Sequence, residues 1–197
     1  MRVLFATTNA GKLLELRELV GADLEVVSLA DLPPQPEVDE DQPTLEGNAE
    51  KKARVYCAAS GLPTLADDSG LCVEALEGRP GVQSARYGAN DAERIARLVA
   101  ELEPVPVGRR GAAFRCALCL VVPEGQVRLE VGECAGEILL APRGTNGFGY
   151  DPVFLIPSLA KTMAELSTAQ KSALSHRGQA FRKMRPHLLA LANKRAV

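Results

Sequence analysis

Short apolar runs alternate with helical apolar stripes along this 197-residue chain. The runs Arg2–Ala6, Leu24–Leu29 and Ala112–Val122 have the length and composition of β-strands. In Leu13–Val20, apolar residues recur at positions 13, 16, 19 and 20, which is the spacing of one helix face. The alternation predicts an α/β fold with a long twisted mixed β-sheet, flanking helices, and two lobes with a central cleft. We see no internal repeat and no linker, so residues 1–197 are interpreted as a single domain.

Capping residues and helix breakers predict the remaining elements. Thr44 is the expected N-cap, and Gly61 the expected stop, of a helix over Thr44–Ser60. Asn90 and Glu93 form a capping pair for the next helix. The further expected elements are strands at 126–133 and 134–140, a short helix beginning at Ser167–Gln170, and a terminal helix over Gln179–Asn193 interrupted near Pro186.

Two adjacent carboxylates, Asp67 and Asp68, lie between the apolar runs Pro63–Ala66 and Leu71–Leu76. This pattern predicts a strand, an acidic corner and a second strand, in which the two side chains point in different directions. Carboxylates this close repel each other unless a cation or hydrogen-bond donors neutralise them, and a divalent metal does so where phosphates must also bind. The alternative is an ordinary turn with solvated acids.

The segment Thr7–Lys12 joins the first expected strand to the first expected helix. A helix N-terminus presents backbone N–H groups, and Lys12 adds a positive charge at the same place, so the segment is interpreted as a phosphate cradle. It is not a Walker A loop, because the leading glycine is absent and Leu13 occupies the Ser/Thr position. A plain strand-to-helix turn is the alternative.

Prolines between Pro33 and Pro43 exclude a regular element, so this stretch is expected to be a loop carrying four acids. Such a loop is usually only solvated, but it can lend one carboxylate to a metal shared with the acidic corner. In the following helix, Asn48 and Lys52 fall at the edge of the buried stripe. From the helix pattern alone, Lys52 is interpreted as a surface residue.

The segment from Arg143 to Pro152 contains three glycines, which let the backbone approach a ligand, together with Phe148, Tyr150 and Asp151. Two flat rings and one acceptor suit a nucleobase; a tight turn with a core aromatic is the alternative. Lys171, His176 and Arg177 supply three donors within seven residues and are interpreted as reading an electron-rich group. We expect the backbone to turn at Gly178 and to aim His176 and Arg177 into the cleft opposite Phe148.

Composition narrows the class of protein. The formal net charge of −2 argues against a broad nucleic-acid-binding face, and no apolar run approaches the roughly 18 to 20 residues of a membrane span. An odd number of cysteines in apolar segments favours a reduced, cytoplasmic protein over a disulfide framework. Cys116 and Cys119 have C-x-x-C spacing, but residues three apart on a strand face opposite sides, and no second ligand pair exists for zinc.

Seven segments together resemble one family. They are TTNAGK, EGNAEKKA, LADDSGL, PGVQSARY, GFGYDPVF, KTMAEL and QKSALSHRGQA. Their order and spacing, from about residue 2 to residue 187, are similar to those of the inosine triphosphate pyrophosphatase family, also called Ham1-like. The resemblance implies a homodimeric, Mg²⁺-dependent hydrolase that converts the non-standard purine nucleotides ITP, dITP and XTP to the monophosphate and pyrophosphate. It implies a small nucleotide as the binding partner, and neither nucleic acid nor membrane.

The resemblance also implies a role for each matching residue. Asp68 corresponds to a metal ligand and proton acceptor, and Glu40 to the acidic metal-loop residue, although Asp39 and Asp41 flank it in the same loop. The implied substrate-binding residues are Thr7, Thr8, Asn9, Ala10, Gly11, Lys12 and Lys52 for the phosphates, Ser69 beside the substrate, and Phe148, Gly149, Tyr150, Asp151, Lys171, His176 and Arg177 for the purine.

Hydrolysis between the α and β phosphates needs an in-line water and neutralisation of the leaving oxygens by Mg²⁺ and lysines. His176 and Arg177 are expected to favour the 6-keto oxygen of inosine and xanthosine over the amine of adenosine. Two alternatives are a Maf-like pyrophosphatase acting on other modified nucleotides, which would lack the GFGYDP and SHR segments, and a nucleotide sensor that does not hydrolyse. Asp68 and Lys12 argue against the sensor.

Overall fold

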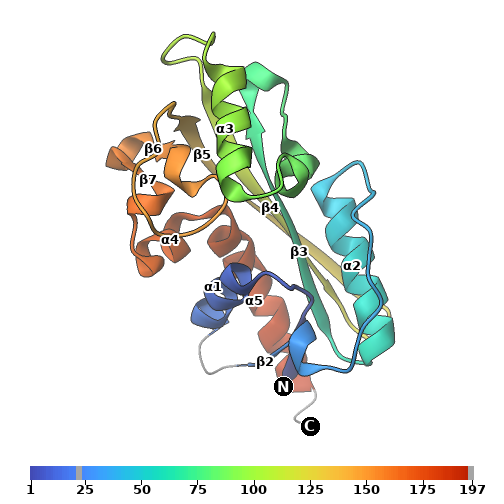
Figure 1. The fold of residues 1–197 in the computed structure, drawn as a ribbon. Helices are drawn as coiled ribbons and strands as arrows, with labels where there is room; N and C mark the ends of the chain where they lie inside the picture. Colours follow the sequence, from blue (N-terminus) through green and yellow to red (C-terminus); the bar gives the residue numbers. More distant parts are fainter. Residues whose placement is uncertain (21–23, 195–197) are drawn as a thin grey trace. The chain divides into compact units, whose positions relative to one another are not determined.

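The computed structural model describes residues 1–20 and 24–194; residues 21–23 and 195–197 of the predicted domain lie outside the described part. Seven strands form one open mixed sheet in the order β2-β1-β3-β4-β5-β6-β7, and helices flank it (Figure 1). The strands are β1 (Arg2–Phe5), β2 (Glu25–Ser28), β3 (Thr64–Val73), β4 (Gly111–Val121), β5 (Val127–Ile138), β6 (Phe154–Ile156) and β7 (Lys161–Thr162). The α-helices are α1 (Ala10–Val20), α2 (Leu45–Ser60), α3 (Asp91–Leu102), α4 (Thr168–Leu174) and α5 (His176–Lys194). The mixed sheet with flanking helices confirms the predicted fold class.

The chain folds as two compact units. The first comprises Met1–Asp68, Cys116–Gly132 and Arg177–Val197, and the second comprises Ser69–Arg115 and Glu133–His176. Two of the predicted motifs therefore contain a unit boundary, one after Asp68 and one after His176. The two lobes of the sequence interpretation correspond to these units, and the cleft stays a prediction.

In the first unit, the pairing of β1 explains why the cradle lies beside the paired acids. β1 is parallel to β2 and to β3, and Phe5 lies opposite Leu65. The pairing continues one step, because the backbone N–H of Ala6 donates to the carbonyl of Leu65 at 2.8 Å. The chain that follows β1, which begins with Thr7, consequently leaves the sheet next to Asp67.

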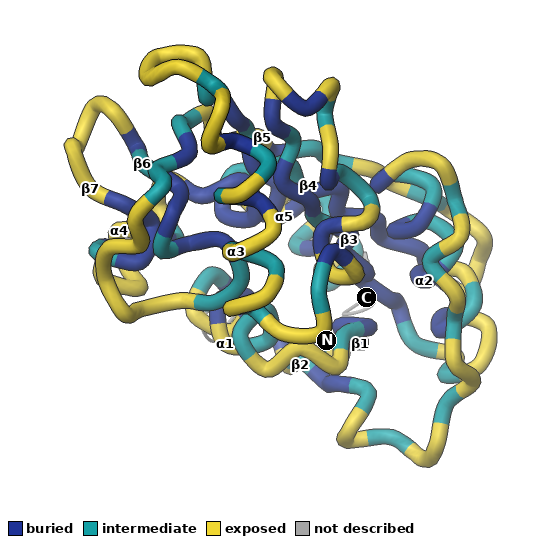
Figure 2. The backbone as a smooth tube through the Cα atoms, turned by 45° about the horizontal axis from the view of Figure 1, so that its top comes forward, coloured by how far each residue is buried: buried dark blue, intermediate teal, exposed yellow. Residues whose placement is uncertain are grey.

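Helices cover both faces of the sheet in the first unit. The inner side chains of α1 and α5, among them Leu16 and Phe181, pack with Phe5, Leu65 and Leu118 into one apolar cluster. Figure 1 shows α2 on the opposite side of β3 and β4 from α5. Because successive strand residues face opposite sides, neighbours in β3 are directed toward different helices. β3 and β4 are buried along most of their length (Figure 2).

The second unit has its own apolar cluster. Leu98 and Leu102 of α3 pack with Leu71, Phe114 and Phe154. In this unit β6 is antiparallel to both β5 and β7. Among the residues that the structure describes, no helix is long and apolar enough to span a membrane.

The expected caps are confirmed. The Thr44 side chain accepts from the backbone of Gly47 at 3.1 Å, and Gly61 ends α2 with a positive φ of 67°. Asn90 accepts from the backbone of Glu93 at 2.9 Å at the start of α3. Ser167 forms the capping box that begins α4.

Four expectations about the elements are wrong. No acidic corner interrupts β3, which runs continuously from Thr64 to Val73. The strands expected at 126–133 and 134–140 are one strand, β5, since Gly132 does not break it. Helix α1 begins at Ala10, three residues before the first apolar position of its stripe. Helix α5 begins at His176 and continues through Gly178 and Pro186, so the backbone does not turn at Gly178.

Candidate functional site

The predicted phosphate cradle is the N-terminus of α1. Asn9 caps the helix, because its Oδ1 accepts from the backbone of Lys12 at 3.0 Å, and its own N–H donates to Thr7 Oγ1 at 3.1 Å. Asn9 thus fixes the turn that presents the first N–H groups of the helix. Four cradle residues line a pocket of about 550 Å³ in the first unit. The full lining is Thr7, Thr8, Asn9, Ala10, Leu13, Ser28, Leu29, Ala30, Gln35, Pro36, Glu37 and Tyr56.

Asp67 belongs to a buried ion-pair chain on the α1 and α5 side of β3. Its Oδ2 lies 2.9 Å from Lys12 Nζ and 3.3 Å from Arg177 Nε. Arg177 Nη1 in turn pairs with Glu15 Oε2. Asp67 is 1% exposed and Arg177 2% exposed. The order Lys12, Asp67, Arg177, Glu15 alternates in charge, so each buried ion has a partner of opposite sign.

The pKa values of this chain follow from burial and charge. Burial by itself would raise the pKa of Asp67, but the charges of Lys12, Arg177 and Lys52 outweigh it and hold the pKa well below its usual range. Burial by itself would lower the pKa of Arg177, but the charges of Asp67 and Glu15 outweigh burial and raise the pKa above its usual value. Asp67 and Arg177 are consequently both charged at neutral pH.

Asp68 lies on the other side of the strand, toward α2. Its Oδ2 accepts from Asn48 Nδ2 at 2.9 Å. Burial raises the pKa of Asp68, and the negative charge of Glu40 adds to the rise, while Lys52 and the Asn48 hydrogen bond oppose it. At Asp68, burial and Glu40 therefore outweigh Lys52 and the Asn48 hydrogen bond.

Lys52 links the acidic loop to β3. Its Nζ lies 2.5 Å from Glu40 Oε1 and 2.7 Å from the backbone carbonyl of Asp67. The helix pattern predicted a surface residue. This prediction is wrong, because Lys52 is only 8% exposed. Burial alone would lower the pKa of Lys52, yet Asp67, Glu40 and Asp68 raise it. Asn48 and Lys52, expected at the edge of the buried face of α2, both lie within that face.

Two carboxylates near Lys52, those of Glu40 and Asp68, are the residues that could hold Mg²⁺. In the described part of the chain no three His, Cys, Asp or Glu side chains form a group that could hold a metal. Mg²⁺ does not need such a group, because it commonly uses one or two carboxylates and completes its shell with water and substrate phosphate. Glu40 and Asp68 both act electrostatically on Lys52, and they are the carboxylates that could provide this minimal site.

Asp151 organises the predicted base-binding segment of the second unit. The carboxylate is 3% exposed, and its Oδ2 accepts from the backbone of Phe148 at 2.9 Å and from Lys171 Nζ at 2.7 Å. The Lys171 ammonium also lies 4.6 Å from the centre of the Phe148 ring. A buried acid, an amine and an aromatic ring are thereby brought together from two distant segments.

Tyr150 is a core residue. It is 4% exposed and packs in the apolar cluster of the second unit, and its hydroxyl donates to the carbonyl of Ser84 at 2.9 Å. Burial raises the pKa of the Tyr150 phenol. For this ring, the core-aromatic alternative describes the structure better than base stacking does.

His176 and Arg177 begin α5 but contact different groups. The His176 ring stacks on Phe114 with centroids 4.9 Å apart, whereas Arg177 pairs with Glu15 and Asp67. Consecutive helix residues point about 100° apart, so a helix places the two side chains differently from the predicted turn. That either residue contacts a purine stays a prediction.

Two of the remaining predicted residues lie within regular elements. Gly11 is in the first turn of α1, and Ser69 follows Asp68 on β3. The structure adds two residues that the sequence interpretation missed, Glu15 and Phe114. A signal existed for Glu15, because it follows Lys12 by three positions on α1 and so shares its face.

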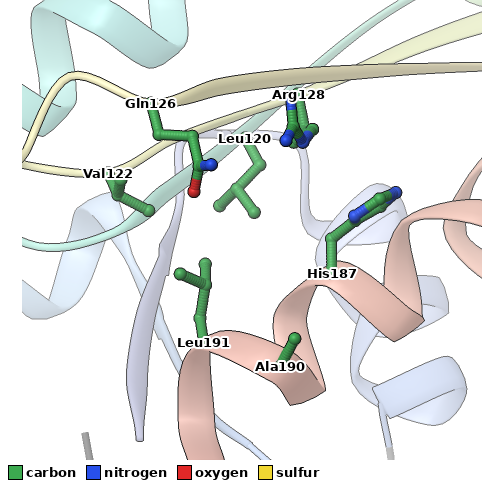
Figure 3. Close-up of a pocket in the computed structure, with 7 residues that line it drawn as sticks. All are labelled: Leu120, Val122, Gln126, Arg128, His187, Ala190 and Leu191. Atoms are coloured by element: carbon green, nitrogen blue, oxygen red, sulfur yellow. The ribbon is translucent and has the colours of Figure 1, made fainter. Parts of the chain in front are cut away.

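A second, smaller pocket lies away from these residues. Figure 3 shows it between β4, β5 and α5, with a volume of about 140 Å³. Its lining consists of Leu120, Val122, Gln126, Arg128, His187, Ala190 and Leu191, which includes none of the predicted site residues. His187 Nε2 lies 3.5 Å from Glu130 Oε1 beside it.

The comparisons with known proteins agree with the resemblance. The model of the Ham1 family matches residues 3–187. The chain belongs to the Ham1 family. It is 50% identical over 191 residues to a dITP/XTP pyrophosphatase of Geobacter sulfurreducens, covering 95% of this chain and 96% of that protein. It is 51% identical over 183 residues to a dITP/XTP pyrophosphatase of Gloeobacter violaceus, covering 92% and 91%.

Solved structures agree with this membership. The Ham1 protein of Staphylococcus aureus has a TM-score of 0.86 to this chain at 36% identity, covering 95% of this chain and 98% of that one. The dITP/XTP pyrophosphatase of Mycobacterium abscessus has a TM-score of 0.77 at 44% identity, covering 94% and 100%.

Proposed function

We propose that this Ham1-family chain hydrolyses the non-standard purine nucleotides ITP, dITP and XTP to the nucleoside monophosphate and pyrophosphate. The relatives named dITP/XTP pyrophosphatase support this proposal. The observation that carries it is the arrangement on β3, where Asp67 binds Lys12 on one side and Asp68 is bound by Asn48 on the other. Phosphate hydrolysis requires positive charge for the phosphate oxygens and a carboxylate that can accept a proton. Lys12 at the start of α1 would supply the first, and Asp68, on the other side of β3, the second.

The first unit supplies the groups for the phosphates. The capped N-terminus of α1 and Lys12 would bind the phosphate oxygens, and Lys52 would add a second ammonium. Asp68 would orient the attacking water in line with the leaving pyrophosphate and accept its proton. Glu40 and Asp68 would hold Mg²⁺, which when bound supplies positive charge against the phosphate oxygens.

The second unit supplies the groups for the base. Phe148 offers a ring for stacking, and Lys171 and His176 offer donors to a 6-keto oxygen. Asp151 orients the Lys171 ammonium through the 2.7 Å contact. We further propose Arg177 as a donor to the purine, although in this structure its guanidinium binds Glu15 and Asp67.

We also propose that the protein is a cytoplasmic homodimer. All five cysteines are free thiols, which supports a reducing compartment. The dimer rests on the family likeness, and light scattering of the purified protein measures it directly: a mass of one chain at micromolar concentration would refute it.

Pyrophosphate release tests the proposed function. Purified protein with Mg²⁺ is assayed against ITP, dITP, XTP, GTP and ATP, and Asp68→Asn serves as the inactive control. We expect kcat/KM for ITP and XTP to exceed that for ATP and GTP, and EDTA to abolish turnover. Binding of ITP without pyrophosphate release would instead support the nucleotide sensor. Preference for modified nucleotides other than these purines would support the Maf-like alternative.

A further inference from the structure

Residues 148–150 of the base segment each form a hydrogen bond, one of them within the segment and two to other parts of the second unit. The Phe148 N–H donates to Asp151 at 2.9 Å, and the Tyr150 hydroxyl donates to the carbonyl of Ser84 at 2.9 Å. The third bond runs from the Gly149 N–H to Asp91 Oδ2 at 2.7 Å. Gly149 and Tyr150 are thereby bonded to two different distant places, and Phe148 to its own segment.

Asp91 belongs to none of the motifs that identified the family. It is the first residue of α3, directly after the N-cap Asn90. Its two oxygens have separate tasks, because Oδ1 lies 2.6 Å from Arg94 Nη1 while Oδ2 accepts from Gly149. The bond to Gly149 links residues 58 positions apart. It therefore fixes the base segment to α3, which is distant from the segment in the sequence.

Gly149 needs such support. Its φ is +62° and that of Gly147 is +78°, and glycines have wide backbone freedom on both sides of Phe148. A segment of this kind samples many orientations unless hydrogen bonds from rigid elements select one. A carboxylate acceptor makes a stronger bond to an N–H than a neutral acceptor does, and α3 is anchored in the core by Leu98 and Leu102.

We propose that Asp91 is a positioning residue for purine recognition: it acts through Gly149 to present the Phe148 ring, and contacts no substrate atom itself. The inference rests on the proposed function, in which Phe148 stacks on the base. Without Asp91 the ring is presented in many orientations. Because the Phe148 N–H and Lys171 share the carboxylate of Asp151, the same loss also displaces the amine proposed to donate to the 6-keto oxygen, which ATP lacks. The groups that act on the phosphates are unchanged. Selectivity among purines, and not the chemical step, is the property that Asp91 controls.

The kinetic test compares Asp91→Ala with wild type on ITP and ATP. Loss of one charge-assisted hydrogen bond corresponds to about a ten-fold effect. We expect kcat/KM for ITP to fall about ten-fold, mainly through KM, and kcat/KM for ATP to change less than about two-fold. Asp91→Asn keeps an oxygen that can accept from Gly149 and should retain most of the selectivity. Equal losses for ITP and ATP would overturn the proposal.

Arg94→Ala is the matched control. It removes the other partner of the same carboxylate and leaves the bond to Gly149 in place. We expect the ratio of kcat/KM for ITP to kcat/KM for ATP to stay within about two-fold of the wild-type ratio. If Arg94→Ala reduces the ratio as much as Asp91→Ala does, stability of the α3 start explains the effect and the positioning role is wrong.

Amide hydrogen exchange supplies a readout that needs no activity. In wild type the Gly149 and Phe148 amides are both hydrogen-bonded, so both should exchange slowly. In Asp91→Ala we expect faster exchange at Gly149 and unchanged exchange at a core amide such as that of Leu118. Unchanged exchange at Gly149 would refute the contact itself. If wild type fails to hydrolyse every nucleotide tested but Gly149 loses protection in Asp91→Ala, the proposed function fails and the contact stands.

Discussion

Asp67 and Asp68 are adjacent on β3, yet their carboxylates bind partners on opposite faces of the sheet. Asp67 Oδ2 lies 2.9 Å from Lys12 Nζ, and Asp68 Oδ2 accepts a hydrogen bond from Asn48 Nδ2 at 2.9 Å. Their pKa values move in opposite directions, downward for Asp67 because cations surround it and upward for Asp68 because burial and Glu40 disfavour its charge. On this one strand, the charged form of Asp67 therefore stabilises the fold, whereas the charged form of the neighbouring Asp68 destabilises it.

The raised pKa of Asp68 predicts that its charge costs stability. A carboxyl group whose folded pKa exceeds the unfolded value of 3.8 makes the fold less stable as the pH rises above that value. Asp68→Asn should therefore unfold at a higher temperature than wild type at pH 7 in EDTA, because Asn can keep the bond to Asn48. Turnover should fall by about a hundred- to ten-thousand-fold. Thermal unfolding and pyrophosphate release measure the two effects; near-normal turnover with Mg²⁺ would rule out the assigned role.

The lowered pKa of Asp67 predicts the opposite dependence on pH. Its contribution to stability is fully present above the unfolded value of 3.8 and is lost as the pH falls through the lower folded value. We expect the difference in free energy of unfolding between wild type and Asp67→Asn to be largest near neutral pH and to shrink below about pH 3.8. Urea denaturation at several pH values measures it. A difference that is constant down to pH 2.5 would contradict the charge-based account.

Lys12→Ala should weaken catalysis on every triphosphate to a similar degree. Lys12 lies at the helix N-terminus and binds Asp67, so it interacts with charge and not with the purine. We expect kcat/KM for ITP and GTP to fall by the same factor, and Lys12→Arg to recover part of the loss. The measurement is the ratio of the two kcat/KM values. A change in that ratio as large as the loss for ITP would mean that Lys12 takes part in choosing the base.

Local signals in the sequence were sufficient for the caps, and long-range partners were not predictable. Thr44 and Gly61 were identified because each acts within a few residues of itself. The continuous β3 was missed because Ser69 and Gly70 resemble turn residues, whereas the packed sheet keeps them extended; a Cβ at Gly70 would lie 2.3 Å from the carbonyl oxygen of Gly81. Arg177 and Glu15 are 162 positions apart, and no local pattern pairs them.

The last prediction concerns this pair. Arg177 is 2% exposed and Glu15 6% exposed. Removing Arg177 therefore takes a counter-ion from a buried carboxylate, and removing Glu15 takes one of the two acids, Glu15 and Asp67, that pair with Arg177. Breaking a buried ion pair from one side typically costs about 3 to 5 kcal/mol, whereas removing both charges costs less than the sum. We expect Arg177→Ala to lower the free energy of unfolding by about 3 kcal/mol or more, and Glu15→Ala to lower it less, because Asp67 still pairs with Arg177. The double variant should be more stable than additivity predicts, by about 1 to 3 kcal/mol.

Chemical denaturation of the four proteins measures this coupling. Strict additivity would mean that Arg177 does not depend on Glu15 in solution, and would favour a guanidinium directed toward the purine instead.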